Sequence, residues 1–153
     1  MPETPVRAVP HERVVIVAED GPRPFGQRVD IGPHHLRADE PLEAGGHASG
    51  PDPYEYVLAG LGACTAMTIR LYAKRKGWPL DRVEVRVRQT MHAAGASKDV
   101  FSREIQLEGD LSVEERQRLF EIAARCPVSL TLTAGAVIQS TLTEVALAGE
   151  ATA

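Results

Sequence analysis

The chain lacks the features that several large classes of protein require. Its 17 Lys and Arg residues are outnumbered by 21 Asp and Glu residues. This balance argues against the clustered basic surface with which proteins meet nucleic acids or anionic membranes, so we expect neither partner. No basic segment followed by an apolar run opens the chain, so we expect no secretory signal and a cytoplasmic location. The five histidines and two cysteines show no CxxC or HxxxH spacing, so no metal or other cofactor is expected.

Internal repeats, low-complexity tracts and interdomain linkers are also absent from the sequence. The chain has 153 residues, of which 43% are apolar, and this is enough to cover one hydrophobic core. We therefore expect a single domain over residues 1–153, with a core from about residue 13 to 145.

The first third of the chain has the pattern of short strands. Residues 13–18, 25–31 and 36–38 are expected to be extended, with glycine and proline between them, and to form a three-stranded meander. Residues 41–53 hold too many glycines and prolines for regular structure and are predicted to be a loop.

A long helix is predicted next. Asp52 can cap its start with Glu55 as capping-box partner, and Gly77 can end it after three basic residues. No charged residue lies between positions 56 and 69, which predicts a core helix buried on every face, and fourteen residues are too few for a bilayer, which takes roughly 20. Gly60 and Gly62 are costly inside a helix, so we expect another element to approach them closely.

The second half completes an α+β pattern. Alternation over residues 82–88 and 101–107 predicts a β-hairpin. Ser112 and Glu115 form a second capping box, for a helix expected to run to Cys126. A short helix or turn and a closing strand over residues 136–145 are expected to follow.

The two cysteines are the main candidates for chemistry. Cys64 lies inside the long helix, and Cys126 lies at a helix boundary 62 residues later. In a reducing compartment such a pair is more often catalytic, redox-sensing or metal-binding than a structural staple. A buried cysteine can also be a small hydrophobe, so the residues alone leave an inert role open.

Three segments together resemble the OsmC/Ohr superfamily of osmotically inducible and organic hydroperoxide resistance proteins. They are Gly50-Pro51-Asp52-Pro53-Tyr54-Glu55, Leu61-Gly62-Ala63-Cys64-Thr65 and Cys126-Pro127-Val128-Ser129. The resemblance extends from about residue 13 to 142. It implies an OsmC-like fold in an intertwined homodimer, with N-terminal strands exchanged between chains and active sites at the interface.

The resemblance also implies a thiol peroxidase acting on small organic peroxides. Cys64 would attack the peroxide and become a sulfenic acid, Cys126 would condense with it to form a disulfide, and an external dithiol would reduce that disulfide. The alternatives are a redox-responsive or ligand-binding protein without rapid turnover, and a pair that only stabilises an oxidised form.

Members of the superfamily activate the attacking cysteine with an arginine from the N-terminal strands and a glutamate at the start of the central helix. Arg23 is closest to the family pattern for the arginine, with Arg28 and Arg37 as alternatives. The glutamate position falls on Tyr54, one place before Glu55, and one residue rotates a helical side chain by about 100°. Glu55 is therefore expected either to act on the thiol or only to cap the helix.

Overall fold

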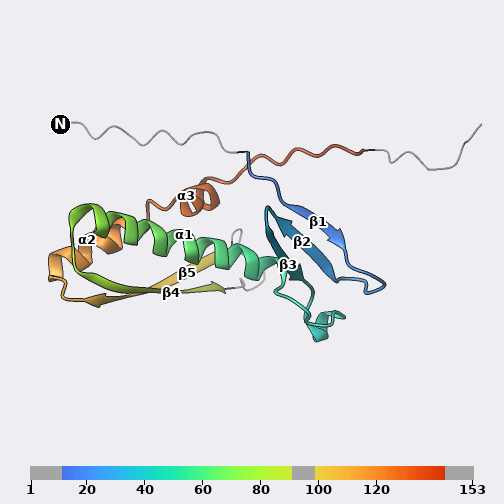
Figure 1. Ribbon diagram of the computed structural model, residues 1–153, viewed down its shortest axis with the longest axis horizontal. Coiled ribbons are helices and arrows are strands. Elements are labelled where there is room, and N and C mark those ends of the chain that lie inside the picture. The colour runs from blue at the N-terminus through green and yellow to red at the C-terminus, as the bar shows by residue number, and fades with distance from the viewer. Residues whose placement is uncertain (1–11, 91–98, 144–153) are drawn as a thin grey trace, which may run out of the picture.

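The computed structural model describes residues 12–90 and 99–143 and confirms the α+β prediction. Figure 1 shows a long helix lying along a two-stranded hairpin, with a separate three-stranded sheet beyond the helix N-terminus. The elements are β1 (Ile16–Glu19), β2 (Gln27–Ile31), β3 (His34–Ala38), the 3-10 helix η1 (Leu42–Ala44), α1 (Pro53–Lys76), β4 (Leu80–Thr90), β5 (Val100–Gly109), α2 (Val113–Ala123) and α3 (Pro127–Ala134).

The three N-terminal strands form the predicted antiparallel meander in the order β1-β2-β3. Val29, at its centre, pairs with Val17 on one side and Leu36 on the other. Gly21 and Gly32 supply the positive φ angles of the two turns. Within the described residues nothing buries the side chains at the start of this sheet. Val15, just before β1, and Ile16 and Val17 in β1 all remain exposed.

The buried carboxylate of Asp39 holds the loop between the sheet and α1 in place through hydrogen bonds. Its oxygens accept four hydrogen bonds, from the backbone N–H groups of Glu40, His47 and Ser49 and from the hydroxyl of Ser49. The bond from the Ser49 hydroxyl is the main reason why the pKa of Asp39 lies below its ordinary value. At Gly46 a Cβ atom would lie 1.9 Å from the carbonyl oxygen of Glu40, so only glycine fits there.

Both ends of α1 are built as the sequence predicts. The Asp52 side chain accepts the N–H of Glu55 at 2.8 Å, and the Glu55 side chain accepts the N–H of Asp52 at 2.9 Å. Gly77 ends the helix in the left-handed conformation, with φ of 68°. By length and composition α1 could also cross a membrane, but core helices of globular proteins pass the same test.

The prediction that α1 is buried on every face is wrong for the single chain. Its buried residues form one stripe at intervals of four, Leu61, Thr65, Ile69 and Ala73. Apolar side chains on the other faces stay exposed, and Met67 reaches 70% exposure. The physical reason is that the hairpin, α2 and α3 pack against α1 but leave its other side chains uncovered within the described residues.

The hairpin β4–β5 supplies the floor under α1. Gly62 faces it closely, because a Cβ atom there would meet Val87 Cγ2 at 3.2 Å, which confirms the close approach expected at this glycine. Among residues 12–90 and 99–143 nothing lies within 4 Å of the corresponding point at Gly60, so these residues do not provide the close approach expected there. The core lies at the other end of α1 and consists of Ile69, Ala73, Leu80, Leu111, Leu119 and Ala123.

The second helix does not run to Cys126. α2 begins with the predicted capping box of Ser112 and Glu115 but ends at Ala123, and Cys126 is instead the N-cap of α3. Proline at position 127 explains the break, because it disfavours a helical backbone at the residue before it, and Cys126 has a ψ of 129°.

The closing strand expected over residues 136–145 is not formed over its described part. Residues 136–143 lie outside helices and strands, and Ile138 is 89% exposed. A strand needs a partner edge, and none of the described strands pairs with this segment. Residues 144 and 145 lie outside the described residues.

Candidate functional site

The fold places the two cysteines against each other. Cys64 projects from the middle of α1, and Cys126 lies where α2 passes into α3, which runs beside α1 (Figure 1). Both are free thiols. Cys64 is partly exposed and Cys126 is fully buried, so a small molecule has access to Cys64 first.

Hydrogen-bond donors surround the sulfur of Cys126. The backbone N–H of Ser129 donates to it over 3.3 Å, and the hydroxyl of Thr65 lies 3.8 Å away in a donating geometry. This sulfur also occupies the N-terminus of α3, where the helix dipole favours negative charge. Such a setting stabilises a thiolate.

The two thiols shift each other's acidity in opposite directions. Burial raises the pKa of Cys64, and hydrogen bonding to Cys126 raises it further, against the N–H of Val128. Burial also acts upward on Cys126, but hydrogen bonds from Ser129, Cys64 and Thr65 outweigh it and leave its pKa below the ordinary value. Of the two thiols, Cys126 is therefore the one that loses its proton more readily.

Arg103 is the functional candidate that the sequence did not single out. It projects from β5 toward α1, and its Nη1 donates to Thr65 Oγ1 at 2.9 Å and to the carbonyl oxygen of Ala123 at 3.0 Å. One signal could have found it. Arg103 falls in phase with the half-buried Ile105 and Leu107, so a cation occupies the inner face of the strand.

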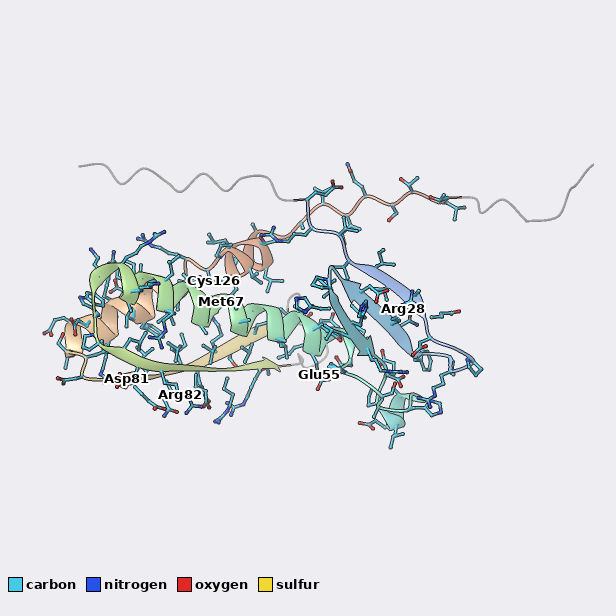
Figure 2. All side chains as sticks on the ribbon, viewed as in Figure 1. Arg28, Glu55, Met67, Asp81, Arg82 and Cys126 are labelled. Atoms are coloured by element: carbon cyan, nitrogen blue, oxygen red, sulfur yellow. The ribbon has the colours of Figure 1, made fainter. Side chains whose placement is uncertain are left out.

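Of the four groups predicted as candidates to activate Cys64, three make other contacts in the single chain and the fourth is exposed. Arg28 pairs with Asp30, Arg37 pairs with Asp20, and Arg23 is exposed in the turn before β2. Glu55 is engaged in the helix cap. Figure 2 shows Arg28 in the sheet and Glu55 at the start of α1, both away from Cys126.

A cavity of about 730 Å³ opens beside the cysteine pair. Its wall contains apolar side chains, the guanidinium of Arg103 and the start of α3, contributed by Leu61, Phe101, Leu132, Arg103 and Ser129 among others. Neither cysteine is among its lining residues, but Arg103 and Ser129 join it to the surroundings of Cys126 through their hydrogen bonds.

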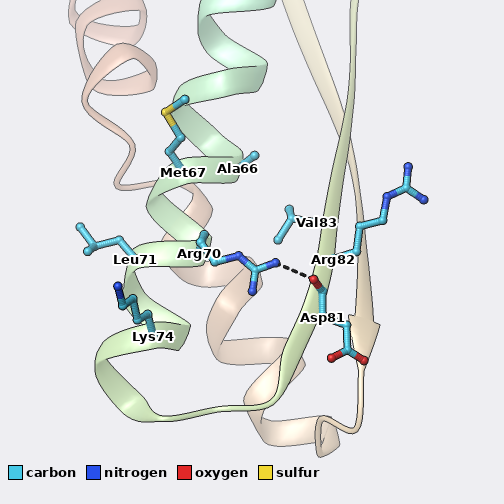
Figure 3. A pocket seen from close by; sticks show the side chains of 8 residues that line it. All are labelled: Ala66, Met67, Arg70, Leu71, Lys74, Asp81, Arg82 and Val83. Carbon is cyan, nitrogen blue, oxygen red and sulfur yellow. Dashed lines mark hydrogen bonds between the residues drawn. The ribbon is translucent and has the colours of Figure 1, made fainter.

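A second hollow, of about 460 Å³, lies between α1 and the start of β4 and is lined by neither cysteine (Figure 3). Met67 and Leu71 line one side of it. Arg70 crosses its floor and donates to the backbone carbonyls of Leu80 and Asp81, which ties α1 to the start of β4. We assign this arginine a structural role.

Comparison with solved structures finds the same fold in several proteins of low sequence identity. An OsmC-like protein from Mycoplasma pneumoniae is 18% identical with a TM-score of 0.69, and the match covers 82% of this chain and 89% of that one. The organic hydroperoxide resistance protein OsmC from Legionella pneumophila is 21% identical with a TM-score of 0.62, covering 80% and 90%. The organic hydroperoxide resistance protein of Bacillus subtilis is 24% identical with a TM-score of 0.55, covering 77% and 89%.

A search of curated proteins finds no match. The profile of OsmC-like proteins matches residues 46–141, a segment that includes α1, both cysteines and the hairpin. The chain therefore belongs to the family of OsmC-like proteins.

Proposed function

We propose that the protein is a thiol peroxidase that reduces small organic hydroperoxides with Cys64 and Cys126. The observation that carries the proposal is the pairing of two free thiols, one accessible and one buried at a helix N-terminus. Two relatives in fold are named for organic hydroperoxide resistance, which agrees with this chemistry.

The reaction starts when the thiolate of Cys64 attacks one oxygen of the hydroperoxide. The O–O bond breaks, the alcohol leaves with a proton, and Cys64 becomes a sulfenic acid. Cys126 then attacks the Cys64 sulfur, the S–O bond breaks, and hydroxide leaves and is protonated to water as the disulfide forms. An external dithiol reduces this disulfide and is itself oxidised, so no bound cofactor is needed.

Cys64 must be activated for the first step, because burial raises the pKa of its thiol. The activation would come from Arg23, Arg28 or Arg37 and from Glu55, supplied by a second chain.

We propose that this second chain is another copy of the protein, in an obligate intertwined homodimer. The support is the exposed apolar surface on three segments: Val15, Ile16 and Val17 in and before β1, Met67 and Leu71 on α1, and Val137, Ile138 and Leu142 after α3. A dimer that covers them would bury well over about 2,000 Å² in total. The proposed location is the cytoplasm, where thiols are kept reduced.

The peroxidase proposal is tested by titrating thiols with cumene hydroperoxide and dithiothreitol. The wild-type protein should lose two thiols per peroxide and turn over many times. Cys64→Ser should consume none, and Cys126→Ser should react once and then advance to the sulfinic acid under excess peroxide. Turnover by Cys64→Ser, or an unmodified Cys64 in treated Cys126→Ser, would contradict the assigned roles.

A second candidate is a redox-responsive or ligand-binding protein without rapid turnover. The raised pKa of Cys64 favours it, because a protonated thiol attacks peroxides slowly. The same titration separates the two functions, since this candidate would lose two thiols once but would not sustain turnover with a dithiol.

A further inference from the structure

Arg103 is a partly buried charged residue on the face of β5 that also carries Ile105 and Leu107. It belongs to β5, yet both of its described hydrogen bonds go to other elements, to Thr65 in α1 and to Ala123 at the end of α2. One nitrogen makes both bonds, and it has one hydrogen for each acceptor.

Each of these two bonds leads to Cys126. Thr65 is fully buried, and its Oγ1 lies 3.8 Å from the Cys126 sulfur. The carbonyl oxygen of Ala123 accepts the backbone N–H of Cys126 at 3.4 Å, in addition to the arginine. Arg103 thus holds the side chain of Cys126 through Thr65 and its backbone through Ala123.

The hydroxyl of Thr65 has one hydrogen and two candidate acceptors. They are the carbonyl oxygen of Leu61 at 2.7 Å and the sulfur of Cys126 at 3.8 Å. A neutral thiol is a weak acceptor, whereas a thiolate competes well for the hydrogen because bonds to charged groups are the stronger ones. The bond that Arg103 donates to Thr65 Oγ1 polarises the hydroxyl and strengthens its donation.

We propose that Arg103 is a positioning residue for disulfide formation, which, through Thr65 and the carbonyl of Ala123, holds the Cys126 thiolate ready to attack the sulfenic acid of Cys64. The proposal rests on the peroxidase function proposed above. In this step the Cys126–Cys64 S–S bond forms, the S–O bond breaks, and hydroxide departs and is protonated to water. Cys64 is the titratable group that lies directly against Cys126, and Arg103 reaches Cys126 through Thr65.

The first measurement needs no peroxide. In a Cys64→Ser background Cys126 is the only thiol, and its thiolate can be followed by absorbance at 240 nm as the pH is raised. Adding Thr65→Val or Arg103→Met should move the titration to higher pH, whereas Thr65→Ser should leave it in place. Arg86→Met is the matched control, because Arg86 lies on the exposed face of the same hairpin.

The second measurement keeps both cysteines and follows oxidation by quenched-flow mass spectrometry. Thr65→Val and Arg103→Met should leave the rate of sulfenic acid formation unchanged and slow disulfide formation roughly tenfold, the loss expected for a hydrogen bond to a charged group. Sulfinic acid at Cys64 should then accumulate.

The two measurements separate failure of this inference from failure of the proposed function. A wild-type protein that forms no disulfide with peroxide would refute the peroxidase, while the 240 nm titration would still test how Cys126 is held. If Cys126 titrates at the same pH in Thr65→Val and Arg103→Met as in the control Arg86→Met, the role proposed for Arg103 is wrong. If Arg103→Met does not fold, Thr65→Val and Arg103→Lys decide, since the single nitrogen of lysine can serve both acceptors.

Discussion

The hydroxyl of Tyr56 donates to the backbone carbonyl of Arg37 and so joins the first turn of α1 to the third strand of the sheet. With the bond from the N–H of Asp39 to the carbonyl of Pro51, it is one of few polar links between the sheet and the rest of the described chain. The position of the N-terminal arginines relative to Cys64 of the same chain therefore depends on this junction.

Arg23 is the first arginine to test. Arg23→Ala should slow the consumption of cumene hydroperoxide at least about tenfold if a guanidinium stabilises the Cys64 thiolate, since a bond to a charged group contributes about 1.5–3 kcal/mol. Arg28→Ala should be milder, because Arg28 already pairs with Asp30. Equal rates for wild type and Arg23→Ala between pH 6 and 8 would move the role to Arg28 or Arg37.

Glu55 can be tested without disturbing its cap. Glu55→Gln should change the melting temperature little, because glutamine can still accept the N–H of Asp52. Asp52→Ala should cost about 1 kcal/mol of unfolding free energy, through loss of the N-cap. A large loss of rate in Glu55→Gln at unchanged melting temperature would make Glu55 part of the chemistry.

Gly60 and Gly62 should respond differently to alanine. Gly62→Ala places a Cβ atom 3.2 Å from Val87, so the gain in helix propensity should be lost to strain. Gly60→Ala meets no atom within 4 Å among the described residues and should raise the unfolding free energy by up to about 1 kcal/mol. Urea unfolding measures both, and a loss of stability in Gly60→Ala would show instead that a partner packs there.

Asp39 should make the junction loop sensitive to acid. Its pKa is lowered in the folded state, so its contribution to stability is present above the unfolded pKa, near 3.8, and is lost as the pH falls through the folded value. In urea denaturation at pH 7, the wild type should have a larger free energy of unfolding than Asp39→Asn. This difference in free energy should become smaller as the pH is lowered toward 3. The exposed Asp110→Asn is the control, and a gap independent of pH would refute this account.

The N-terminal strands should be required for assembly. Deleting the residues before Asp30 removes β1 and part of β2, so the truncated protein should unfold if these strands join the sheet of a partner. Circular dichroism and sedimentation measure the outcome. An active, well-folded monomer of the full chain at micromolar concentration would contradict the dimer.

Local rules in the sequence predicted much of this fold. The capping boxes at Asp52 and Ser112, the glycine stop at Gly77 and the alternation in the hairpin each depend on neighbours within a few residues. The family resemblance identified the cysteines as a pair. Two predictions were wrong: burial of α1 on every face, and the closing strand. Both require packing partners that are distant in the sequence, and the described residues of a single chain do not provide these partners.

The candidate site was only partly predictable for the same reason. Cys64 and Cys126 stand out because they are the only cysteines. Arg103 does not, because its importance arises from a contact with Thr65, 38 positions away. An arginine in phase with buried aliphatic residues was the available signal, and it was indistinguishable from an imperfect alternation.

The position of Cys126 at the start of α3 has a consequence for backbone order. Its sulfur is the cap that satisfies the N–H of Ser129, and α3 has only eight residues with which to hold itself together. A sulfur bound in a disulfide carries no charge and accepts poorly, so oxidation would weaken this cap. The amide hydrogens in the first turn of α3 should then exchange faster in the oxidised protein than in the reduced one. Oxidation of the Cys126 sulfur would in this way lower the stability of α3.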